Sequence, residues 1–562
     1  MSFLHDAFFP ALVSRQGIEL SGDNMTLFLR TLGIVLLVLL CPLAAAESPK
    51  LIVIMAIDQM RPDRLNASMP GGLGRLMREG HVFSEATLDH GLTNTCPGHV
   101  VMSTGVNPNK AGIPGNSYVD HQTMQDRYCV DDQDSAFQVY NAPLIRSPNA
   151  LKATTIGTWL KNKSPNSKVF SVSGKDRAAI TLAGKNADGV YWYHTDALGF
   201  TTSMYYGELP DVVAEFNNGD FFTSGFGGSF PESWVHGEGS KRIDDYVGES
   251  EMFQRKSAHP LNVGEPSARA KQIYFSPYLD MATGALAKKV IEAEQLGQRG
   301  VTDMLAVSFS ATDVVGHMYG PFSAESEDAI AILDAEVGLL LDALDEATDG
   351  DYVLAMSADH GVMPLPEWLV ETGEMQCATQ GGRIDLEREG MKLYWHLYWE
   401  FTFPFGKPSD LVGISAAGIT VNARYAEELG VTVDEVVSYL DEYYEGKDYI
   451  AAAWTNQELI TSDDPFARLY RNSFVEGKSA HLIPQFEETC LAFRSQGTSH
   501  GSPYLYDRRV PMVFFGKGVR QGVSTIERHS IDIAPTLGAR LGLTMPDNLD
   551  GIALPIWEGA SE

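Results

Sequence analysis

Three aspartates and three histidines of this sequence stand where metal-binding side chains would be expected, after apolar segments or in short polar motifs. They are Asp58, Asp313, His317, Asp359, His360 and His500. Alone, an aspartate after a strand is more often a helix cap, and a single histidine is more often a hydrogen-bonded structural residue. Together they supply the oxygen and nitrogen ligands that zinc favours, with no thiolate to indicate a closed structural site. The set therefore predicts a zinc centre.

A candidate nucleophile lies in the segment Leu-Thr-Asn-Thr-Cys-Pro-Gly-His, residues 92–99. The residues that follow can continue as a helix, which would place Thr95 at the helix N-terminus, where backbone amides and the helix dipole stabilise an alkoxide. A plain N-cap is the alternative interpretation of this threonine. Thr93 and Cys96 are the other candidate nucleophiles, although a metal-activated hydroxyl explains the carboxylates better than a thiol does. We therefore predict that Thr95 is the nucleophile.

The apolar segments indicate how these residues are brought together. Continuous apolar runs, typical of strands in a buried parallel sheet, cover residues 51–57, 168–173, 304–309, 352–356 and 511–515. Helical patterns lie between them, and the clearest, at 326–347, carries one apolar stripe that indicates core packing. This alternation predicts an α/β fold with a doubly wound, mostly parallel sheet between helices. Such sheets bind ligands at the carboxyl ends of their strands.

Two stretches interrupt the alternation in the predicted α/β domain, which spans 47–562. The first, at about 186–270, is rich in glycine and aromatic residues. The second, at about 365–490, contains strand-like segments at 418–422 and 449–454 and a helix-like segment at 433–444, which predicts a small inserted α+β cap. We expect the aromatic run at 394–405 to serve packing rather than ligand binding.

The composition narrows the classes of protein. With 562 residues, of which 44% are hydrophobic and 20% charged, the chain is globular, and disordered, collagen-like and multi-span membrane proteins are excluded. The 73 acidic residues outnumber the 42 basic ones and give a formal net charge of −31. This charge argues against binding to nucleic acids or anionic membranes, since both need a basic face. An anionic substrate would need locally placed positive charge.

The N-terminal residues predict export. Arg30 precedes the apolar run 32–40 and the small residues 44–46, which is the order of a secretory signal peptide over 25–46, with 1–24 as an upstream segment. The run is shorter than the roughly 20 residues that span a bilayer, so we expect a mature chain from Glu47 with no stable membrane anchor. Cys41 suggests a lipoprotein signal as an alternative, but Leu40 before it is larger than such processing prefers.

Four cysteines remain in the predicted mature chain. They are Cys96, Cys129, Cys377 and Cys490. An oxidising exported compartment allows them to form up to two disulfides, and the sequence does not distinguish between the three possible pairings.

Taken together, the motifs resemble the alkaline phosphatase superfamily, and within it the zinc-dependent, phosphate-irrepressible alkaline phosphatases with a threonine nucleophile and a type I phosphodiesterase/nucleotide pyrophosphatase-like domain. The resemblance rests on Ile-Asp-Gln-Met-Arg-Pro-Asp, Thr-Cys-Pro-Gly-His, Gly-Ile-Pro-Gly-Asn, Lys-Asp-Arg, Asp-Val-Val-Gly-His, Ala-Asp-His-Gly and Thr-Ser-His-Gly-Ser-Pro. It implies that one zinc ion is held by Asp58, Thr95, Asp359 and His360. The other would be held by Asp313, His317 and His500.

The substrate class depends on the groups that meet the phosphoryl oxygens. Lys175 and Arg177 follow the apolar run 168–173. On their chemistry alone, a Lys-Asp-Arg triplet is more often an exposed turn with its own ion pairs. The resemblance instead implies that these two residues, with Asn116, bind the phosphoryl oxygens of a monoester dianion, which needs more cationic donors than a diester does.

The resemblance thus implies an alkaline phosphatase, a zinc-dependent phosphomonoester hydrolase that forms a phosphothreonine intermediate and releases inorganic phosphate. Two zinc ions about 4 Å apart can hold the attacking and leaving oxygens. The alternative is a phosphodiesterase or nucleotide pyrophosphatase of the same superfamily, which normally lacks the Lys/Arg pair. A sulfatase pattern is not matched at Cys96, and a non-catalytic phosphate-binding protein would not need the metal residues. We expect a bacterial, periplasmic or secreted monomer that acts on small phosphate monoesters and binds no nucleic acid.

Overall fold

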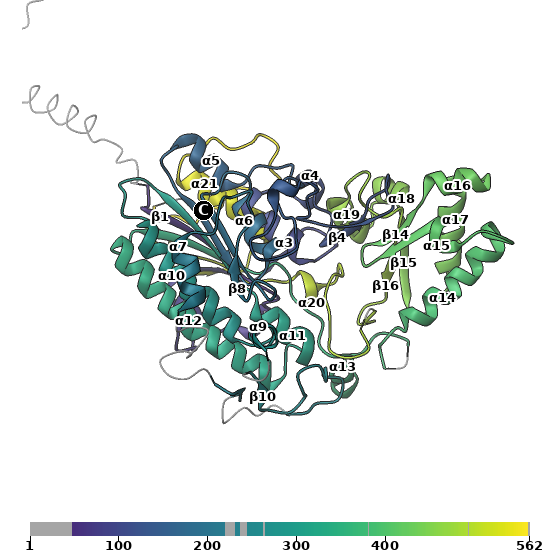
Figure 1. Ribbon diagram of the computed structural model, residues 1–562, viewed down its shortest axis with the longest axis horizontal. Helices are drawn as coiled ribbons and strands as arrows, with labels where there is room; N and C mark the ends of the chain where they lie inside the picture. Colours follow the sequence, from purple (N-terminus) through teal and green to yellow (C-terminus); the bar gives the residue numbers. More distant parts are fainter. Residues whose placement is uncertain are drawn as a thin grey trace, which may run out of the picture. The chain divides into compact units, whose positions relative to one another are not determined.

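A large mixed sheet forms the centre of the α/β unit (Figure 1). The computed structural model describes residues 48–219, 231–236, 244–261, 265–379, 381–492 and 494–559, and the predicted signal peptide lies outside them. Within these residues, nine strands make up the central sheet. In spatial order they are β18 (Gly522–Ser524), β2 (His81–Phe83), β17 (Met512–Gly516), β12 (Tyr352–Ser357), β1 (Leu51–Ile57), β11 (Asp303–Phe309), β6 (Val169–Ser173), β7 (Gly189–His194) and β8 (Gly199–Thr201).

The middle of this sheet is parallel. β1 pairs in parallel with β12 on one side and with β11 on the other, and β6 and β7 continue in the same direction. Antiparallel pairs occur towards the edges, where β17 pairs with β12 and β2, and β8 pairs with β7. The predicted mostly parallel α/β fold is confirmed, and each of the five apolar runs forms a strand of the sheet.

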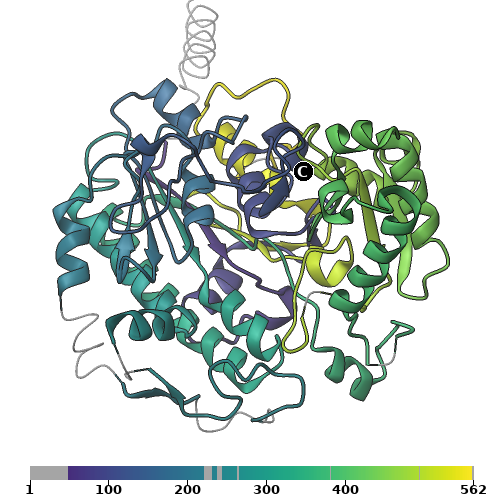
Figure 2. The same ribbon diagram turned by 45° about the vertical axis from the view of Figure 1, so that its right-hand side comes forward.

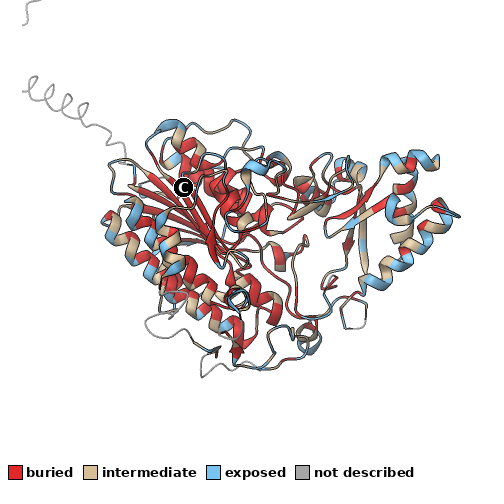
Figure 3. Cartoon of the chain, in the orientation of Figure 1, coloured by how far each residue is buried: buried red, intermediate tan, exposed pale blue. Residues whose placement is uncertain are grey.

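Helices cover both faces of the sheet, which explains why β1 is apolar throughout. Its residues Leu51, Val53, Met55 and Ile57 face one hydrophobic core, which includes α10 (Tyr278–Glu294) and α12 (Ala324–Thr348). Ile52, Ile54 and Ala56 face a second core, which includes α5 (Ile156–Lys163) and α21 (Ile533–Arg540). All seven residues of β1 are buried, as the red central strands of Figure 3 show. The predicted stripe on α12 is buried in the first core, as expected.

A second, smaller sheet lies in the segment predicted as a cap (Figures 1 and 2, green). Its antiparallel strands, in spatial order, are β13 (Val412–Ser415), β14 (Gly418–Val421), β16 (Leu482–Phe486) and β15 (Ile450–Thr455). Its helices include α14 (Leu386–Leu397), α16 (Ala423–Leu429), α17 (Val433–Tyr444) and α19 (Pro465–Ser473). Apolar residues of α14, α16, α17 and the sheet form a hydrophobic core that contains only cap residues. Ala467 and Tyr470 of α19 belong instead to a cluster that includes Leu92.

The segment at 186–270 is only partly an insertion in the main domain. Its first residues form β7 and β8 and so extend the central sheet. Later residues form the short pair β9 (Ser233–Trp234) and β10 (His259–Pro260) and the helix α9 (Pro266–Tyr274). The exact limits of both inserted segments remain predictions.

The aromatic run at 394–405 is less packed than we expected. Trp395, Trp399 and Phe405 are 62%, 54% and 94% exposed, whereas Leu393 and Leu397 of the same helix are buried. Residues four apart share one face of a helix, so the two leucines face the cap core and the two tryptophans face outward. The indole rings contact other aromatic rings of the run instead.

Two disulfides join the four cysteines, Cys96 to Cys129 and Cys377 to Cys490. The first ties the start of α3 (Thr95–Thr104) to the loop after β5 (Asp126–Tyr128), and the second closes a loop that contains most of the cap. In the part of the chain that the structure describes, no helix is both long and apolar enough to cross a membrane.

Candidate active site and metal centre

The three predicted aspartates meet at one edge of the central sheet. Asp58 and Asp359 follow β1 and β12, and Asp313 lies in α11 (Ala311–Tyr319), which follows β11. Because β12, β1 and β11 are adjacent and parallel, their carboxyl ends lie together. All three side chains are buried, with exposed fractions of 0%, 0% and 3% for Asp58, Asp359 and Asp313.

The three predicted histidines present their Nε2 atoms to these carboxylates. Nδ1 of His360, His317 and His500 lies 3.0, 2.8 and 2.7 Å from the backbone oxygens of Gly361, Thr498 and Thr93, respectively. A carbonyl oxygen can only accept, so each Nδ1 carries the hydrogen, and Nε2 of the neutral ring keeps its lone pair. Nε2 of His360 lies 3.1 Å from Asp359, and those of His317 and His500 lie 3.2 and 3.6 Å from Asp313. This orientation is the one that metal-binding histidines adopt.

The residues therefore fit a metal centre. Asp58 Oδ1 and Thr95 Oγ1 are buried and have no hydrogen-bond partner among the described residues, and Asp359 Oδ2 and His360 Nε2, also buried, lie 3.1 Å from each other. An unsatisfied buried polar atom costs about 1–3 kcal/mol, and more if it is charged. A cation bound between these lone pairs would remove that cost.

The ligand atoms form two groups, each within 4.8 Å. One contains Asp313, His360 and His500, and the other contains Asp58, Asp359 and His99. His360 thus lies beside His500, with 3.4 Å between the ring centroids, as well as beside Asp359. All six predicted aspartate and histidine ligands converge, but their division between two ions remains a prediction.

His99 is a structural member of the second group. Its Nδ1 lies 2.8 Å from the backbone oxygen of Thr95 and its Nε2 lies 2.8 Å from Ser308 Oγ, so both nitrogens already have partners. Burial lowers the pKa of His99 to about 4, and the ring is neutral near pH 7. We did not predict this residue from the sequence.

Two of the three histidines are neutral near pH 7, and the third carries a proton that a bound cation would displace. Burial lowers the pKa of His317 to about 4, and it lowers that of His500 well below its usual value. Burial also disfavours a charged His360, but the nearby carboxylates, Asp359 first among them, outweigh it and raise the pKa of His360 to about 9. A metal ion must compete with that one proton, so metal affinity falls as the pH falls below about 9.

Thr95 lies where the predicted nucleophile should be. It is the first residue of α3, after the N-cap Asn94, and it is fully buried. The rival Thr93 donates its hydroxyl to the backbone oxygen of Ser502 at 2.9 Å, and Cys96 is bound in a disulfide. The structure therefore leaves Thr95, among the three candidates, with an uncommitted nucleophilic atom.

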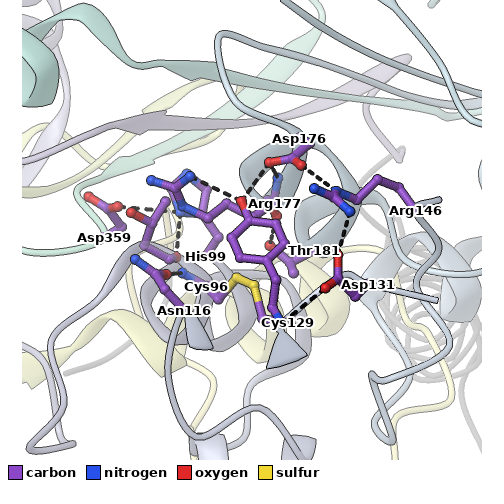
Figure 4. The surroundings of a disulfide bond; sticks show 12 residues. Cys96, His99, Asn116, Cys129, Asp131, Arg146, Asp176, Arg177, Thr181 and Asp359 are labelled. Carbon is purple, nitrogen blue, oxygen red and sulfur yellow. Dashed lines mark hydrogen bonds and ion pairs between the residues drawn. A yellow bond between two sulfur atoms is a disulfide. The ribbon is translucent and has the colours of Figure 1, made fainter. Parts of the chain in front are cut away.

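Asn116 contacts the start of α3, and Lys175 contacts two of the predicted metal ligands. Asn116 Oδ1 accepts a hydrogen bond from the backbone nitrogen of Cys96 at 2.8 Å, which leaves its amide nitrogen available as a donor (Figure 4). Lys175 Nζ lies 2.6 Å from Asp58 Oδ2 and 2.5 Å from Asp313 Oδ2. Burial disfavours its charge, but the two carboxylates raise the pKa of Lys175, so it stays charged.

Arg177 is supported by a network of charged side chains (Figure 4). Its guanidinium donates to Tyr128 Oη at 3.1 Å, and that hydroxyl donates to Asp176 Oδ1 at 2.7 Å. Arg146 pairs with Asp176 at 2.7 Å and also with Asp131. Lys175 is therefore buried and ion-paired, and Arg177 is half-buried and hydrogen-bonded, unlike the exposed turn that their residue types alone favoured.

Sequence reasoning missed Gln59, which bridges the predicted metal ligands. Its backbone nitrogen donates to Asp359 Oδ1 at 3.0 Å, and its side-chain Nε2 donates to Asp313 Oδ1 at 2.6 Å. Its φ of 63° turns the chain sharply after β1. Gly316 makes room for this side chain, because a Cβ at that position would lie 1.9 Å from Gln59 Oε1. The only available signal was the place of Gln59 beside Asp58.

Gly98 permits the close approach of α3 to Asp359, a predicted metal ligand, and substitution of this glycine tests whether that approach matters. A Cβ at Gly98 would lie 2.1 Å from the backbone oxygen of Asp359. We expect Gly98→Ala to displace Asp359 from Thr95 and to reduce kcat/KM by about 100-fold, the effect of a misplacement of about 1 Å. Gly390→Ala is the matched control, since no atom lies within 4 Å of its Cβ. Kinetics and thermal unfolding of both variants check the prediction, and wild-type kinetics for Gly98→Ala would contradict it.

A cleft of about 520 Å³ opens beside the site. Three predicted site residues, Asn116, His317 and His500, line one part of it. Ile483 and Phe486 of the cap strand β16 line it on the other side. The cleft can therefore hold a small substrate with one end at the candidate metal ligands and the other against the cap.

A mostly parallel α/β sheet that gathers carboxylates, imidazoles and a helix-terminal threonine at one edge is the architecture of the alkaline phosphatase superfamily. The family model described as type I phosphodiesterase / nucleotide pyrophosphatase matches residues 52–463. The chain therefore belongs to the type I phosphodiesterase/nucleotide pyrophosphatase family.

Three similar proteins carry alkaline phosphatase names. The chain is 30% identical to alkaline phosphatase PhoK of Sphingomonas sp., over 92% of this chain and 93% of that protein. It is 31% identical to alkaline phosphatase PhoV of Synechococcus elongatus, over 90% of this chain and 92% of that protein. The crystal structure of alkaline phosphatase PafA superposes with a TM-score of 0.83 at 26% identity, over 92% of this chain and 100% of that one.

Proposed function

We propose that this protein is a zinc-dependent alkaline phosphatase that hydrolyses small phosphate monoesters through a phosphothreonine at Thr95. One observation carries the proposal. The Thr95 hydroxyl is buried at a helix N-terminus without a hydrogen-bond partner among the described residues, within a cluster of carboxylates and imidazoles. The names of the similar proteins support the same activity.

Each group has a role in an in-line displacement at phosphorus. Two zinc ions, held by Asp58, Thr95, Asp359 and His360 and by Asp313, His317 and His500, would supply a Lewis acid for the attacking and the leaving oxygen. The N-terminus of α3 favours negative charge on Thr95. Its oxygen attacks phosphorus, the leaving group departs as an alkoxide, and water then hydrolyses the phosphothreonine to release inorganic phosphate.

The donors beside Thr95 favour a monoester. A monoester dianion carries more charge on its non-bridging oxygens than a diester monoanion does, so it gains more from cationic donors. Lys175 is charged and buried, Arg177 is charged and half-buried, and Asn116 has a free amide donor. A phosphodiesterase of the same family would have less use for this set.

We also propose that the protein is exported to the periplasm or secreted. Both disulfides support this, since disulfides persist in oxidising compartments. Phosphatase activity in the periplasmic or culture fraction of expressing cells, and its absence from the cytoplasmic fraction, would be the expected result.

The metal hypothesis predicts that the proposed active site of the purified protein binds about two zinc ions per chain, as a two-metal displacement requires. Chelation should abolish hydrolysis of p-nitrophenyl phosphate, and zinc rather than magnesium should restore it, because imidazole ligands suit zinc. His500→Ala should lower both zinc content and turnover. His396→Ala, at an exposed cap position, is the matched control. A fully active protein without metal would refute the proposal.

A further inference from the structure

A second group of acidic and imidazole side chains lies outside the proposed active site. It is carried by the segment around β9 and β10 and by the first turn of α12. Its members are His236, Asp244, Glu249 and Glu325, and we call it the β9–α12 cluster. Ligand atoms of His236, Asp244 and Glu325 lie within 4.8 Å of one another, and His236 Nε2 lies 3.7 Å from Asp244 Oδ1.

Several of these atoms are buried without partners. Among the described residues, neither ring nitrogen of His236 has a hydrogen bond, and the same holds for Glu249 Oε1 and Glu325 Oε2. The exposed fractions of both glutamates are 0%. A fully buried carboxylate that presents a free oxygen is costly unless a proton or another positive charge meets it. Burial, with the charge of Glu325, raises the pKa of Glu249 to about 9, so a bound cation would displace a proton there.

The other oxygen of each glutamate is already held in place. Glu325 Oε1 lies 3.2 Å from His259 Nε2, and Glu249 Oε2 accepts from the backbone nitrogen of Tyr246 at 2.8 Å. A carboxylate with one oxygen fixed by the protein and the other free is arranged as a ligating carboxylate is. Among the described residues of this segment, the basic side chains Arg255 and Lys256 both pair with Asp245 instead.

We propose that the β9–α12 cluster binds a divalent transition-metal ion, such as zinc or manganese, through His236, Asp244 and Glu325, with Glu249 as a further carboxylate. An imidazole beside carboxylates suits these ions, whereas calcium takes oxygen ligands only. This site is separate from the proposed catalytic centre and does not depend on it.

A metal ion bound at the β9–α12 cluster would hold the inserted loop close to α11, the helix that carries His317. Ser250 N donates to Met318 O at 2.8 Å, beside His317 on α11. Gly248 O accepts from Gly497 N at 2.6 Å, and the next residue, Thr498, donates its backbone nitrogen to His317 O at 2.9 Å. The loop that carries Asp244 and Glu249 therefore contacts both chain segments that hold His317.

Metal analysis of the full chain tests the proposal. The protein, loaded with zinc or with manganese and passed through a desalting column, should retain one more equivalent than His236→Ala does. His500→Ala should lose metal from the catalytic centre, and the double variant should lose both contributions. His396→Ala should match the wild type. Equal metal content in the wild type and in His236→Ala would overturn the proposal. Calcium binding at the cluster that persists in His236→Ala would overturn it as well.

Glu325→Gln gives an independent test, because an empty cluster and a metal-bound cluster predict opposite changes in melting temperature. If the cluster held no cation, removal of one buried negative charge would relieve repulsion and raise the melting temperature. If the cluster holds a metal, the same change weakens a ligand and lowers the melting temperature, and added zinc stabilises the variant less than the wild type. A raised melting temperature, unresponsive to metal, would overturn the proposal. His236→Gln provides the same comparison should Glu325→Gln fail to fold.

Discussion

The Thr95→Ala protein is expected to show no measurable steady-state hydrolysis of phosphate monoesters while it keeps its fold and most of its metal. The hydroxyl supplies the attacking oxygen, but it is only one of the seven predicted ligands, so the other six can still hold the ions. Removal of a nucleophile that works together with its activating groups lowers kcat by a factor on the order of 10⁴–10⁶. Turnover of p-nitrophenyl phosphate, zinc content and circular dichroism would be measured together.

Two further variants sharpen this test. Thr95→Ser keeps the attacking oxygen and should retain appreciable activity. Thr93→Ala removes the neighbouring hydroxyl, which is hydrogen-bonded to the backbone oxygen of Ser502, and it should leave the catalytic step intact. Full activity in Thr95→Ala, or a phosphorylated Thr93 trapped by rapid acid quenching, would exclude Thr95 as the nucleophile.

The double change Lys175→Ala with Arg177→Ala should lower kcat/KM for a monoester by about a thousandfold. A hydrogen bond from a charged donor to a phosphoryl oxygen contributes about 2 kcal/mol, or roughly thirtyfold in rate when it forms in the transition state. The two contributions are taken as additive. A diester has fewer charged oxygens and should lose far less, which p-nitrophenyl phosphate and bis-p-nitrophenyl phosphate would reveal.

Lys175 also pairs with two predicted metal ligands, so the variant needs a metal assay. Zinc content near that of the wild type would assign the loss to phosphoryl binding rather than to the ion pairs with Asp58 and Asp313. Lys289→Ala with Lys392→Ala changes the net charge equally at exposed positions and is the matched control. Equal losses on both substrates would show that the pair does not set specificity, and a wild type faster on the diester would favour a phosphodiesterase.

The convergence of the predicted ligands followed from sequence because of one property of parallel sheets. Asp58 and Asp359 each follow a continuous apolar run, and such runs become adjacent central strands whose carboxyl ends share an edge. The position of Thr95 at a helix N-terminus also followed from the sequence, and its role as the nucleophile remains a prediction. These predictions depend on local sequence and on general topology, and neither requires knowledge of side-chain packing.

Other features depended on contacts between distant residues and could not be predicted. Gln59 has no residue-type signature, and its role comes from the turn after β1 that aims its amide at Asp313. The cysteine pairing needed the distances between chain segments, and the outward direction of Trp395 needed the orientation of α14 against the cap core.

The separate hydrophobic core of the cap bears on how such an enzyme can diversify. All ten residues of α3 are buried, so a substitution near the nucleophile disturbs the chemistry and the stability together. Ile483 and Phe486 instead face the cleft from a sheet that is stabilised by its own core. Lineages can therefore acquire new substrate preferences through the cap while selection preserves one reaction in the α/β unit. Substrate preference and the chemical reaction would then depend on different parts of the same chain.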